Sequence, residues 1–297
     1  MDYSSKNKLS VVVVFYNMRR EAERTLYTLS AEYQRGVQPS QWEVIAVDNG
    51  SSEPLGEAFV KSFGKNFSYR YFDTQSLSPC MAVNEVVEQC SGENVSICLD
   101  GARMCSPQII RYSLLGLTLA KRSFVCTLGW HLGPDVQNRL FEQGYGQKDE
   151  DTLLDSVDWQ QNGYQLFDVS TLAPSSGGGF FRNISESSFF TVRREKYLCN
   201  GGLDERFVSP GGGLASCDLY RRFCESGRFT TVHIIGEGSF HQFHGGVTTN
   251  VQEAEHPRDA MRAEYRQLRG RPFAPPIVEP MYIGHLPAPA ARFLAKR

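Results

Sequence analysis

The chain has 297 residues, a formal net charge of −2, and ordinary proportions of hydrophobic (41%) and charged (22%) residues. This length allows one large domain or two small ones with a substantial core. The small net charge gives no electrostatic reason to expect nucleic acid as a partner, and no stretch approaches the roughly 20 apolar residues that a transmembrane segment needs.

The cysteines and the N-terminus predict a reduced compartment. None of the eight cysteines forms a C-x-x-C pair, and several stand inside apolar runs, where a reduced cysteine acts as a small hydrophobic residue. Residues 1–6 are polar and lead directly into a strand-like run, which is not the pattern of a secretory signal. We therefore expect a cytoplasmic protein with no transmembrane segment, and peripheral contact with a membrane stays open.

Strand and helix patterns alternate through the first hundred residues. Residues 9–16 (L-S-V-V-V-V-F-Y) form a nearly continuous β-branched run, typical of a parallel strand covered on both faces. This alternation predicts an α/β fold with a mostly parallel central sheet, flanked by helices and joined by right-handed crossovers. Further strands are expected at residues 42–47, 69–72 and 95–99, and helices at residues 20–33, 57–63 and 78–90.

Polar residues follow three of these predicted strands. Asn17 follows the first strand, Asp48 and Asn49 follow the second, and Asp100 follows the fourth. Open α/β sheets bind ligands beyond the carboxyl ends of their strands, so we expect these side chains to converge on one crevice. Taken alone, Asp100 could instead cap a helix that begins near residues 106–107.

The pattern weakens between residues 132 and 176, where charged and amide residues mix with scattered aromatic ones. Such a long irregular stretch is usually functional or disordered, and the aromatics favour a functional loop region. Order returns with a strand at 188–192, a helix at 218–225 and a strand at 230–235. A helix from residue 253, a proline-rich tail and a short helix near residues 290–295 complete the chain.

Two nucleotide-binding motifs are missing. Neither G-x-x-x-x-G-K-S/T nor G-x-G-x-x-G follows the first strand, so the P-loop and dinucleotide-binding classes lose their main support. The triple glycines at residues 177–179 and 211–213 lack that strand-to-helix context and are more typical of tight turns or mobile loops.

An ordered set of motifs resembles the family-two GT-A glycosyltransferases. The opening of that family is similar to V-V-V-V-F-Y-N at residues 11–17 and V-I-A-V-D-N-G-S-S at residues 44–52. Each motif is weak alone, and the ordered set over about residues 9–246 is specific. The later matches are Ala82 and Asn84, L-D-G at 99–101, F-F-T-V-R-R-E-K-Y at 189–197, G-G-L-D-E-R-F at 201–207 and D-L-Y-R-R at 218–222.

This resemblance implies a GT-A fold, the Rossmann-like fold of nucleotide-diphospho-sugar transferases. It places a glycosyltransferase domain at residues 1–250, with a nucleotide-binding half at about 9–105 and an acceptor and metal half at 106–250. Residues 251–297 would form a C-terminal helix and proline-rich tail.

The resemblance also assigns a nucleotide-sugar site. Asp48 offers acceptor atoms for ribose hydroxyls or a base N–H, with Asn49 and Ser51 supporting its turn. Asn84 would reach the ribose or the diphosphate, or be merely solvated. Arg182 would clamp a phosphate or an acidic acceptor, although a surface ion pair explains it equally well. With Arg182, which the chemistry of arginine suggests, the predicted nucleotide-sugar-binding residues are Phe15, Tyr16, Asn17, Asp48, Asn49, Ser51, Asn84, Asp100, Gly101 and Arg182.

The family's metal motif is altered in this chain. Family members carry D-x-D after the fourth strand, whereas Asp100-Gly101-Ala102 keeps a single carboxylate. His244 in the preferred interpretation, and His241 in the second, would complete the ligands of Mn²⁺ or Mg²⁺. The alternative for these two residues is a pair of buried or loop histidines.

The family's general base is missing as well. Inverting members place an acidic pair just before the D-L of the late helix, where this chain has Ala215 and Ser216. Asp218, Asp204 and Glu205 are the candidate catalytic acids, although Asp218 could simply cap its helix. It is equally open that the acceptor is already an anion, or that the site is catalytically weak.

The resemblance thus implies an inverting, metal-assisted glycosyltransferase (a hexosyltransferase) that uses a nucleotide-sugar, with a UDP-sugar expected. The acceptor (a saccharide, a lipid-linked molecule or a small molecule) and the oligomeric state are open. One alternative is a degenerate protein of the same fold that binds a nucleotide-sugar without turnover. Another, a nucleotidyltransferase, would need a Gly-rich loop bearing Arg or Lys after the first strand, which residues 15–18 do not form.

Overall fold

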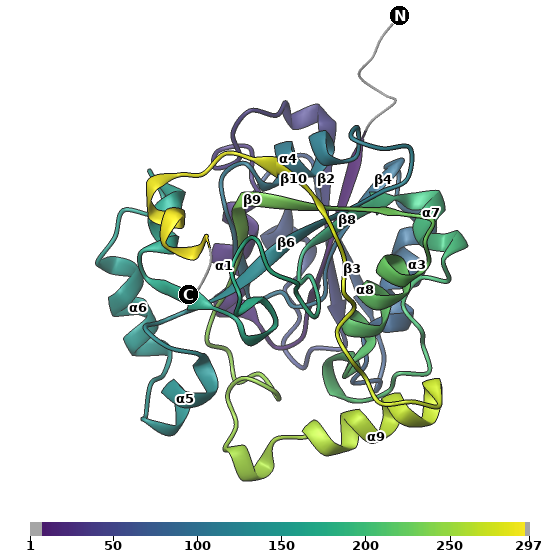
Figure 1. The fold of residues 1–297 in the computed structure, drawn as a ribbon. Helices are drawn as coiled ribbons and strands as arrows, with labels where there is room; N and C mark the ends of the chain where they lie inside the picture. The colour runs from purple at the N-terminus through teal and green to yellow at the C-terminus, as the bar shows by residue number, and fades with distance from the viewer. Residues whose placement is uncertain (1–7, 295–297) are drawn as a thin grey trace, which may run out of the picture.

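The computed structural model describes residues 8–294, which build one ten-stranded sheet flanked by helices (Figure 1). The strands are β1 (Leu9–Phe15), β2 (Trp42–Asn49), β3 (Phe67–Phe72), β4 (Asn94–Cys98), β5 (Arg103–Cys105), β6 (Ser123–Leu132), β7 (Ser170–Leu172), β8 (Phe190–Arg193), β9 (Thr230–His241) and β10 (Met281–Gly284). The α-helices are α1 (Arg19–Thr28), α2 (Glu57–Lys61), α3 (Cys80–Gln89), α4 (Ile109–Gly116), α5 (Gln137–Glu142), α6 (Gln147–Asp155), α7 (Arg194–Cys199), α8 (Ala215–Glu225) and α9 (Arg258–Arg269).

The strand directions place most carboxyl ends at one edge of the sheet. The order is β10-β9-β6-β8-β4-β1-β2-β3, with β5 paired to β9 and β7 paired to β6. Along this path only β8 runs antiparallel to its neighbours. The predicted α/β class with a mostly parallel sheet is therefore confirmed, and β1, β2, β4 and β9 end at the same edge.

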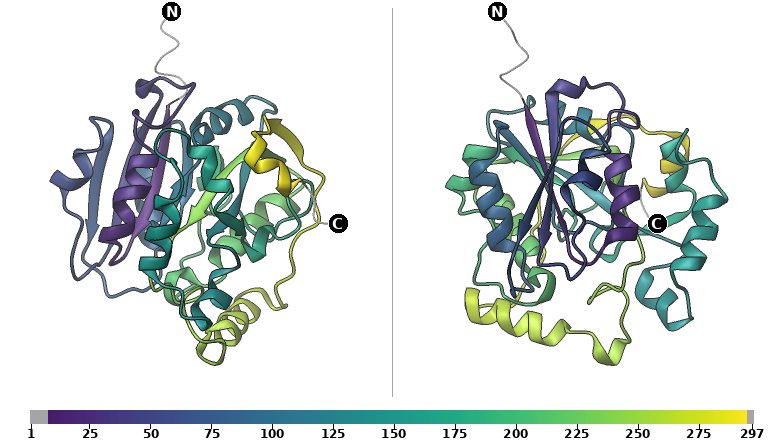
Figure 2. Two further views of the ribbon diagram at one scale, coloured as in Figure 1. Left: turned by 90° about the vertical axis from the view of Figure 1, so that its left-hand side faces the viewer. Right: turned by 180° about the vertical axis from the view of Figure 1, so that it is seen from behind.

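Alternating side chains of β1 enter two separate cores. Val11 and Val13 pack into the core that α1 and α4 cover, whereas Val12 and Val14 face the core that includes residues of α3 and α8. Burial of both faces explains the continuous β-branched run of β1, because a strand covered on both sides has no face that can be polar. The views in Figure 2 show helices on either side of the sheet.

The structure adds a central strand that we did not predict and lengthens another. All ten residues of β6 are buried. The strand expected at 230–235 continues to His241, because glycines occupy two positions where a larger residue would be strained or would clash. Gly236 takes φ +77°, beside an irregularity in the β6–β9 register, and a Cβ on Gly238 would lie 2.0 Å from the Trp130 ring. Only glycine fits the second of these positions.

The irregular stretch at 132–176 contains the short helices α5 and α6 and two 3₁₀ turns. In the proline-rich tail, β10 adds a parallel strand to β9, and the expected final helix is a 3₁₀ turn, η6 (Ala288–Phe293). Residue 295, the end of that expected helix, lies outside the described residues. The domain boundary at residue 250 stays a prediction. Nowhere in residues 8–294 is a helix long and apolar enough to cross a bilayer.

Candidate active site

The first two strand ends are joined by hydrogen bonds. Asn17, which takes φ +52°, follows β1 and donates its backbone N–H to Ser51 Oγ at 2.8 Å. Its side-chain oxygen accepts from the backbone N–H of Ser52 at 2.9 Å. The adjacent strands β1 and β2 therefore end in a single linked turn region, as the convergence argument requires.

Asp48 is buried and organises this region. Its two oxygens accept hydrogen bonds from the backbone N–H of Ser51 and of Leu55 and from the Tyr69 hydroxyl, each at 3.0 Å. Burial, followed by the charge of Asp48, raises the pKa of Tyr69. A carboxylate has about four acceptor sites, so most of the capacity of Asp48 is used within the protein.

Of the other residues predicted at this edge of the sheet, some are buried and pack within the protein, and others are exposed. Phe15 is buried against Gly101, where an added Cβ would lie 2.2 Å from the Phe15 ring. Asn49 is buried and donates to the Ser76 carbonyl at 3.0 Å. Tyr16 is 45% exposed and Asn17 is exposed, which leaves these two side chains within reach of a ligand.

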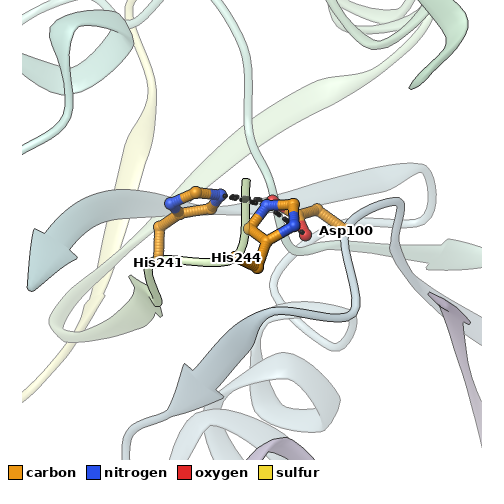
Figure 3. A group of neighbouring side chains, drawn as sticks. All are labelled: Asp100, His241 and His244. Atoms are coloured by element: carbon orange, nitrogen blue, oxygen red, sulfur yellow. Dashed lines mark hydrogen bonds and ion pairs between the residues drawn. The ribbon is translucent and has the colours of Figure 1, made fainter. Parts of the chain in front are cut away.

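Asp100 meets both predicted histidines (Figure 3). Its Oδ2 lies 2.7 Å from His241 Nε2, its Oδ1 lies 3.7 Å from His244 Nε2, and the two histidine nitrogens are 3.2 Å apart. One ligand atom from each residue lies within 4.8 Å of the others, close enough for all three to contact one metal ion. The structure thus brings together the three residues that we predicted as metal ligands.

The short strand β5 creates this contact. After β4, the turn at Asp100 is closed by a hydrogen bond from the Ala102 N–H to Asp100 Oδ1 at 3.0 Å. The chain then pairs antiparallel with the end of β9, with Arg103 opposite His241. Asp100 therefore caps its own turn, and the helix-cap alternative does not hold, because α4 has no side-chain cap.

Gln137 fixes the orientation of His241. The side-chain N–H₂ of Gln137 donates to the His241 carbonyl at 2.9 Å, which places its oxygen 2.6 Å from His241 Nδ1. Nδ1 then carries a proton, and Nε2 is the nitrogen that faces Asp100. Metal-binding histidines typically have such a partner on the second ring nitrogen.

Electrostatics favour the protonation states that bind metals. Burial works against the charge of Asp100, but His241 and His244 together hold its pKa well below the usual range. Burial lowers the pKa of His241 to about 4, against the attraction of Asp100. Asp100 is therefore a carboxylate, the form that binds a cation.

Two residues beside Asp100 were missed by the sequence analysis. Arg103 Nε lies 3.6 Å from Asp100 Oδ2, and its Nε and Nη1 are buried with no hydrogen-bond partner among residues 8–294. His131 pairs with His241 across β6 and β9, and burial lowers its pKa well below the usual value. Neither residue has a sequence signal, because both positions depend on strand pairings between distant segments.

A cavity of about 930 Å³ opens at Asp100, Arg103, His241 and His244. Its other walls include Glu186 and Ser216, together with three arginines of α9. They are Arg258, Arg262 and Arg266. Because these positions are spaced by four residues, the three side chains lie on one face of the helix. In Figures 1 and 2, α9 lies at the bottom of the molecule.

The three predicted catalytic acids lie elsewhere. Buried Asp218 is hydrogen-bonded to Arg222 and Arg269, and Asp204 to Arg206 and Arg269. The hydrogen bond from Arg206 is the main cause that lowers the pKa of Asp204. None of the three acids lines the cavity at Asp100.

Asn84 and Arg182 also lie outside that cavity. The Asn84 side chain donates to Glu205 at 2.9 Å and to the Leu203 carbonyl at 2.8 Å, and its oxygen accepts from the Tyr197 hydroxyl at 2.7 Å. It therefore ties α3 to the segment after α7 and has little capacity left for a ligand. Arg182 is exposed and is not part of the cavity lining that residues 8–294 provide.

Comparison with known proteins adds a family and a fold. Residues 10–111 match the family Glycosyl transferase family 2. S. aureus TarS 1–349 in complex with UDP is similar over 89% of this chain and 72% of that chain, with a TM-score of 0.53 and 12% identity. The complex of TarS 1–349 with UDP-GlcNAc is similar over 80% and 59%, with a TM-score of 0.53 and 14% identity.

A longer S. aureus TarS chain matches over 87% of this chain, with a TM-score of 0.54 and 14% identity. The present chain spans only 42% of its length. No curated protein sequence matches the chain. Residues 10–111 thus match glycosyl transferase family 2, and the chain has a GT-A fold.

Proposed function

We propose that the protein transfers a sugar from a nucleoside-diphosphate-sugar to an acceptor hydroxyl, with the assistance of a divalent cation. The observation that carries this proposal is the cluster of Asp100, His241 and His244 beside the carboxyl ends of parallel strands. The match of residues 10–111 to glycosyl transferase family 2 gives the reaction class.

The ligand set fits Mn²⁺ better than Mg²⁺. Mg²⁺ prefers oxygen ligands in a strict octahedron, whereas imidazole nitrogens suit transition metals. A cation bound to Asp100, His241 and His244 would stabilise the negative charge of the departing diphosphate. The hydrogen bond of Gln137 to His241 holds one of these ligands in place.

The donor site would extend from this cluster to the end of β1. Arg103, with two buried and unpartnered nitrogens among the described residues, is placed to bind the diphosphate. Tyr16 and Asn17 would contact the base and ribose, while Asp48 keeps their support rigid. The TarS complexes with UDP and UDP-GlcNAc support a UDP-sugar as the donor. Inversion at the anomeric carbon is proposed from the family resemblance.

The acceptor side is positively charged. Arg258, Arg262 and Arg266 line the cavity, and of these Arg258 forms a close ion pair, with Glu253 at 2.5 Å. We therefore expect an acceptor that carries negative charge. A cytoplasmic location remains a prediction, and the eight cysteines, all of them free thiols, support it.

The proposal is tested by measuring sugar release from a panel of UDP-sugars. With Mn²⁺ present, one member of the panel should raise the melting temperature and be hydrolysed slowly to UDP and free sugar, because water can replace the acceptor. Binding without any release would favour the second candidate, a degenerate nucleotide-sugar-binding protein. The loss of the acidic pair at Ala215 and Ser216 is the observation that favours that candidate.

A further inference from the structure

The start of α8 lacks the acidic pair that the family resemblance leads us to expect, but a carboxylate lies against it. Ser216 Oγ donates a hydrogen bond of 2.6 Å to Glu186 Oε2. Cys217 Sγ lies 3.7 Å from the same oxygen. Glu186 precedes Ser216 by 30 residues, so a different segment supplies negative charge at the position of the missing acid.

Glu186 faces the proposed active site. It lines the same cavity as Asp100, His241 and His244. Among residues 8–294, Asp100 and Glu186 are the two carboxylates in the lining of this cavity. Since Asp100 is engaged with the two histidines, Glu186 is the carboxylate that remains for proton transfer.

One oxygen of Glu186 is available. Oε2 accepts from Ser216, whereas Oε1 accepts no hydrogen bond from any residue in the described part of the chain and is not a buried atom. The side chain is therefore held at one oxygen and open at the other. This is the geometry that a base needs in order to accept a proton from a bound hydroxyl.

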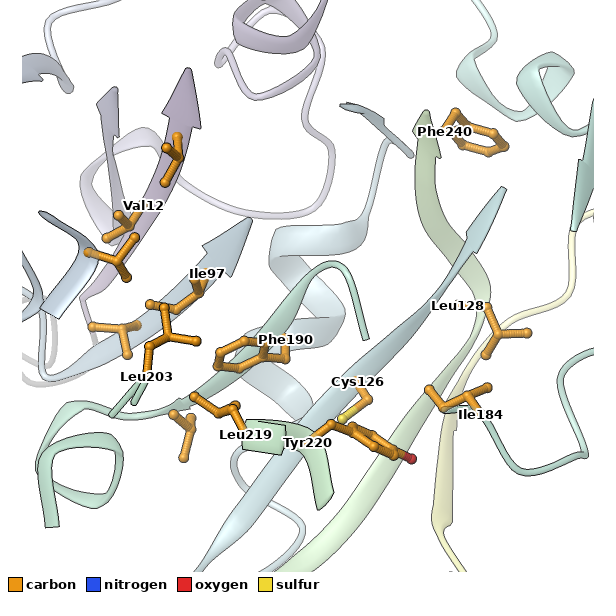
Figure 4. Close-up of a cluster of buried hydrophobic side chains, with 14 of the residues drawn as sticks. Val12, Ile97, Cys126, Leu128, Ile184, Phe190, Leu203, Leu219, Tyr220 and Phe240 are labelled. Atoms are coloured by element: carbon orange, nitrogen blue, oxygen red, sulfur yellow. The ribbon is translucent and has the colours of Figure 1, made fainter. Parts of the chain in front are cut away.

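The backbone around Glu186 is anchored on both sides. The Ser185 N–H donates to the Ser175 carbonyl at 3.0 Å, and Ser187 Oγ donates to the Thr127 carbonyl and accepts from the Thr127 N–H. Ile184 lies in the same buried cluster as Leu128 (Figure 4). Such anchoring pre-organises a catalytic group.

We infer that Glu186 is the general base of the proposed transfer reaction, in place of the missing acidic pair. Its carboxylate takes the proton of the acceptor O–H as the oxygen forms its bond to the anomeric carbon. The bond from that carbon to the diphosphate oxygen breaks, and its electron pair leaves with the diphosphate. This inference rests on the proposed function.

The test compares wild type with Glu186→Gln, which keeps the shape of the side chain and the hydrogen bond from Ser216. We expect the Mn²⁺-dependent rate of sugar release from the best-bound UDP-sugar to fall by about 10²- to 10⁴-fold. The melting-temperature shift caused by that UDP-sugar should not change. Glu88→Gln, at an exposed position of α3, is the matched control.

A second variant separates catalysis from folding. Adding Ser216→Asp to Glu186→Gln returns a carboxylate to the position that the family uses, and should restore part of the lost rate. A wild-type rate in Glu186→Gln would overturn the inference while leaving the proposed function intact. If the wild-type protein binds no UDP-sugar, or binds one without release, the proposed reaction fails and the base with it.

Discussion

Asp100, at the end of β4, lies beside two histidines from a segment that is distant in the sequence: His241 at the end of β9 and His244 in the turn after β9. The family resemblance singled out Asp100, the metal chemistry of imidazole suggested both histidines, and the structure brings the three together. The resemblance did not point to Arg103, because an arginine three residues after an aspartate is unremarkable until β5 pairs with β9. The same holds for Glu186, whose partner Ser216 lies on another element.

Replacing the single residue Asp100 tests the metal site. Asp100→Asn removes the only carboxylate of the ligand set that residues 8–294 provide, so Mn²⁺ affinity measured by calorimetric titration should fall by more than about 100-fold, the upper range for outer-shell changes. Asp155→Asn, at an exposed position of α6, should leave the affinity unchanged. Equal Mn²⁺ binding by both variants would contradict the assignment.

Gln137 provides a subtler test, because it does not touch the metal in our proposal. Gln137→Leu removes the acceptor that orients His241 while leaving all three ligands in place. Mn²⁺ affinity should fall by about 10- to 100-fold. Unaltered affinity in a folded Gln137→Leu protein would show that His241 needs no such support.

We expect Glu237 to make the stability of the protein depend on pH. It is buried, accepts from the Tyr164 hydroxyl at 2.6 Å and from the Gln108 N–H at 2.9 Å, and burial raises its pKa to about 7. Because the folded-state pKa lies above the unfolded one, this group adds stability at low pH that is lost as pH rises toward 7. The free energy of unfolding in urea should fall between pH 5 and pH 8 more steeply in wild type than in Glu237→Gln. Parallel pH profiles would refute this.

At the scale of elements, strands with a local signature were predictable and those stabilised by distant partners were not. β1 and β2 follow from β-branched runs, because both faces are buried. Our prediction ended β9 before Gly236, because glycine is typical of strand ends. In the structure, Gly236 and Gly238 instead allow an irregular register and a close approach to Trp130. β10 lies in a proline-rich segment, and only its pairing with β9 makes it a strand.

The C-terminal segment should contribute measurably to stability. The Phe293 ring lies 5.6 Å from that of Trp130 and 6.1 Å from that of Phe167, and the Phe180 N–H donates to the Phe293 carbonyl at 3.0 Å. Phe293→Ala should lower the free energy of unfolding by about 3 kcal/mol. Ile277→Ala, at a position that is 90% exposed, should change it by less than about 0.5 kcal/mol. Similar stabilities for the two variants would contradict the packing described here.

At the scale of the molecule, one sheet edge gathers the proposed chemistry. The strands β4, β1 and β2 are parallel neighbours and end at one edge of the sheet, as expected from parallel α/β topology. Of the three residues predicted to converge there, Asp100 lines the cavity, whereas Asn17 and Asp48 are not part of its lining. The three cavity arginines of α9 were not predicted, because only the folded chain shows that this helix, which the sequence placed outside the glycosyltransferase domain, reaches the cavity. Asp204, Asp218 and Glu205 match family motifs in sequence but lie outside that cavity, where arginines or Asn84 hold them.

The most direct test of the central claim is the Mn²⁺ dependence of UDP binding, measured as the shift in melting temperature. UDP should stabilise the wild-type protein strongly with Mn²⁺ and weakly with EDTA, and Asp100→Asn should lose the Mn²⁺-dependent part of the shift. An equal shift with Mn²⁺ and with EDTA, retained in Asp100→Asn, would contradict a cation at Asp100, His241 and His244.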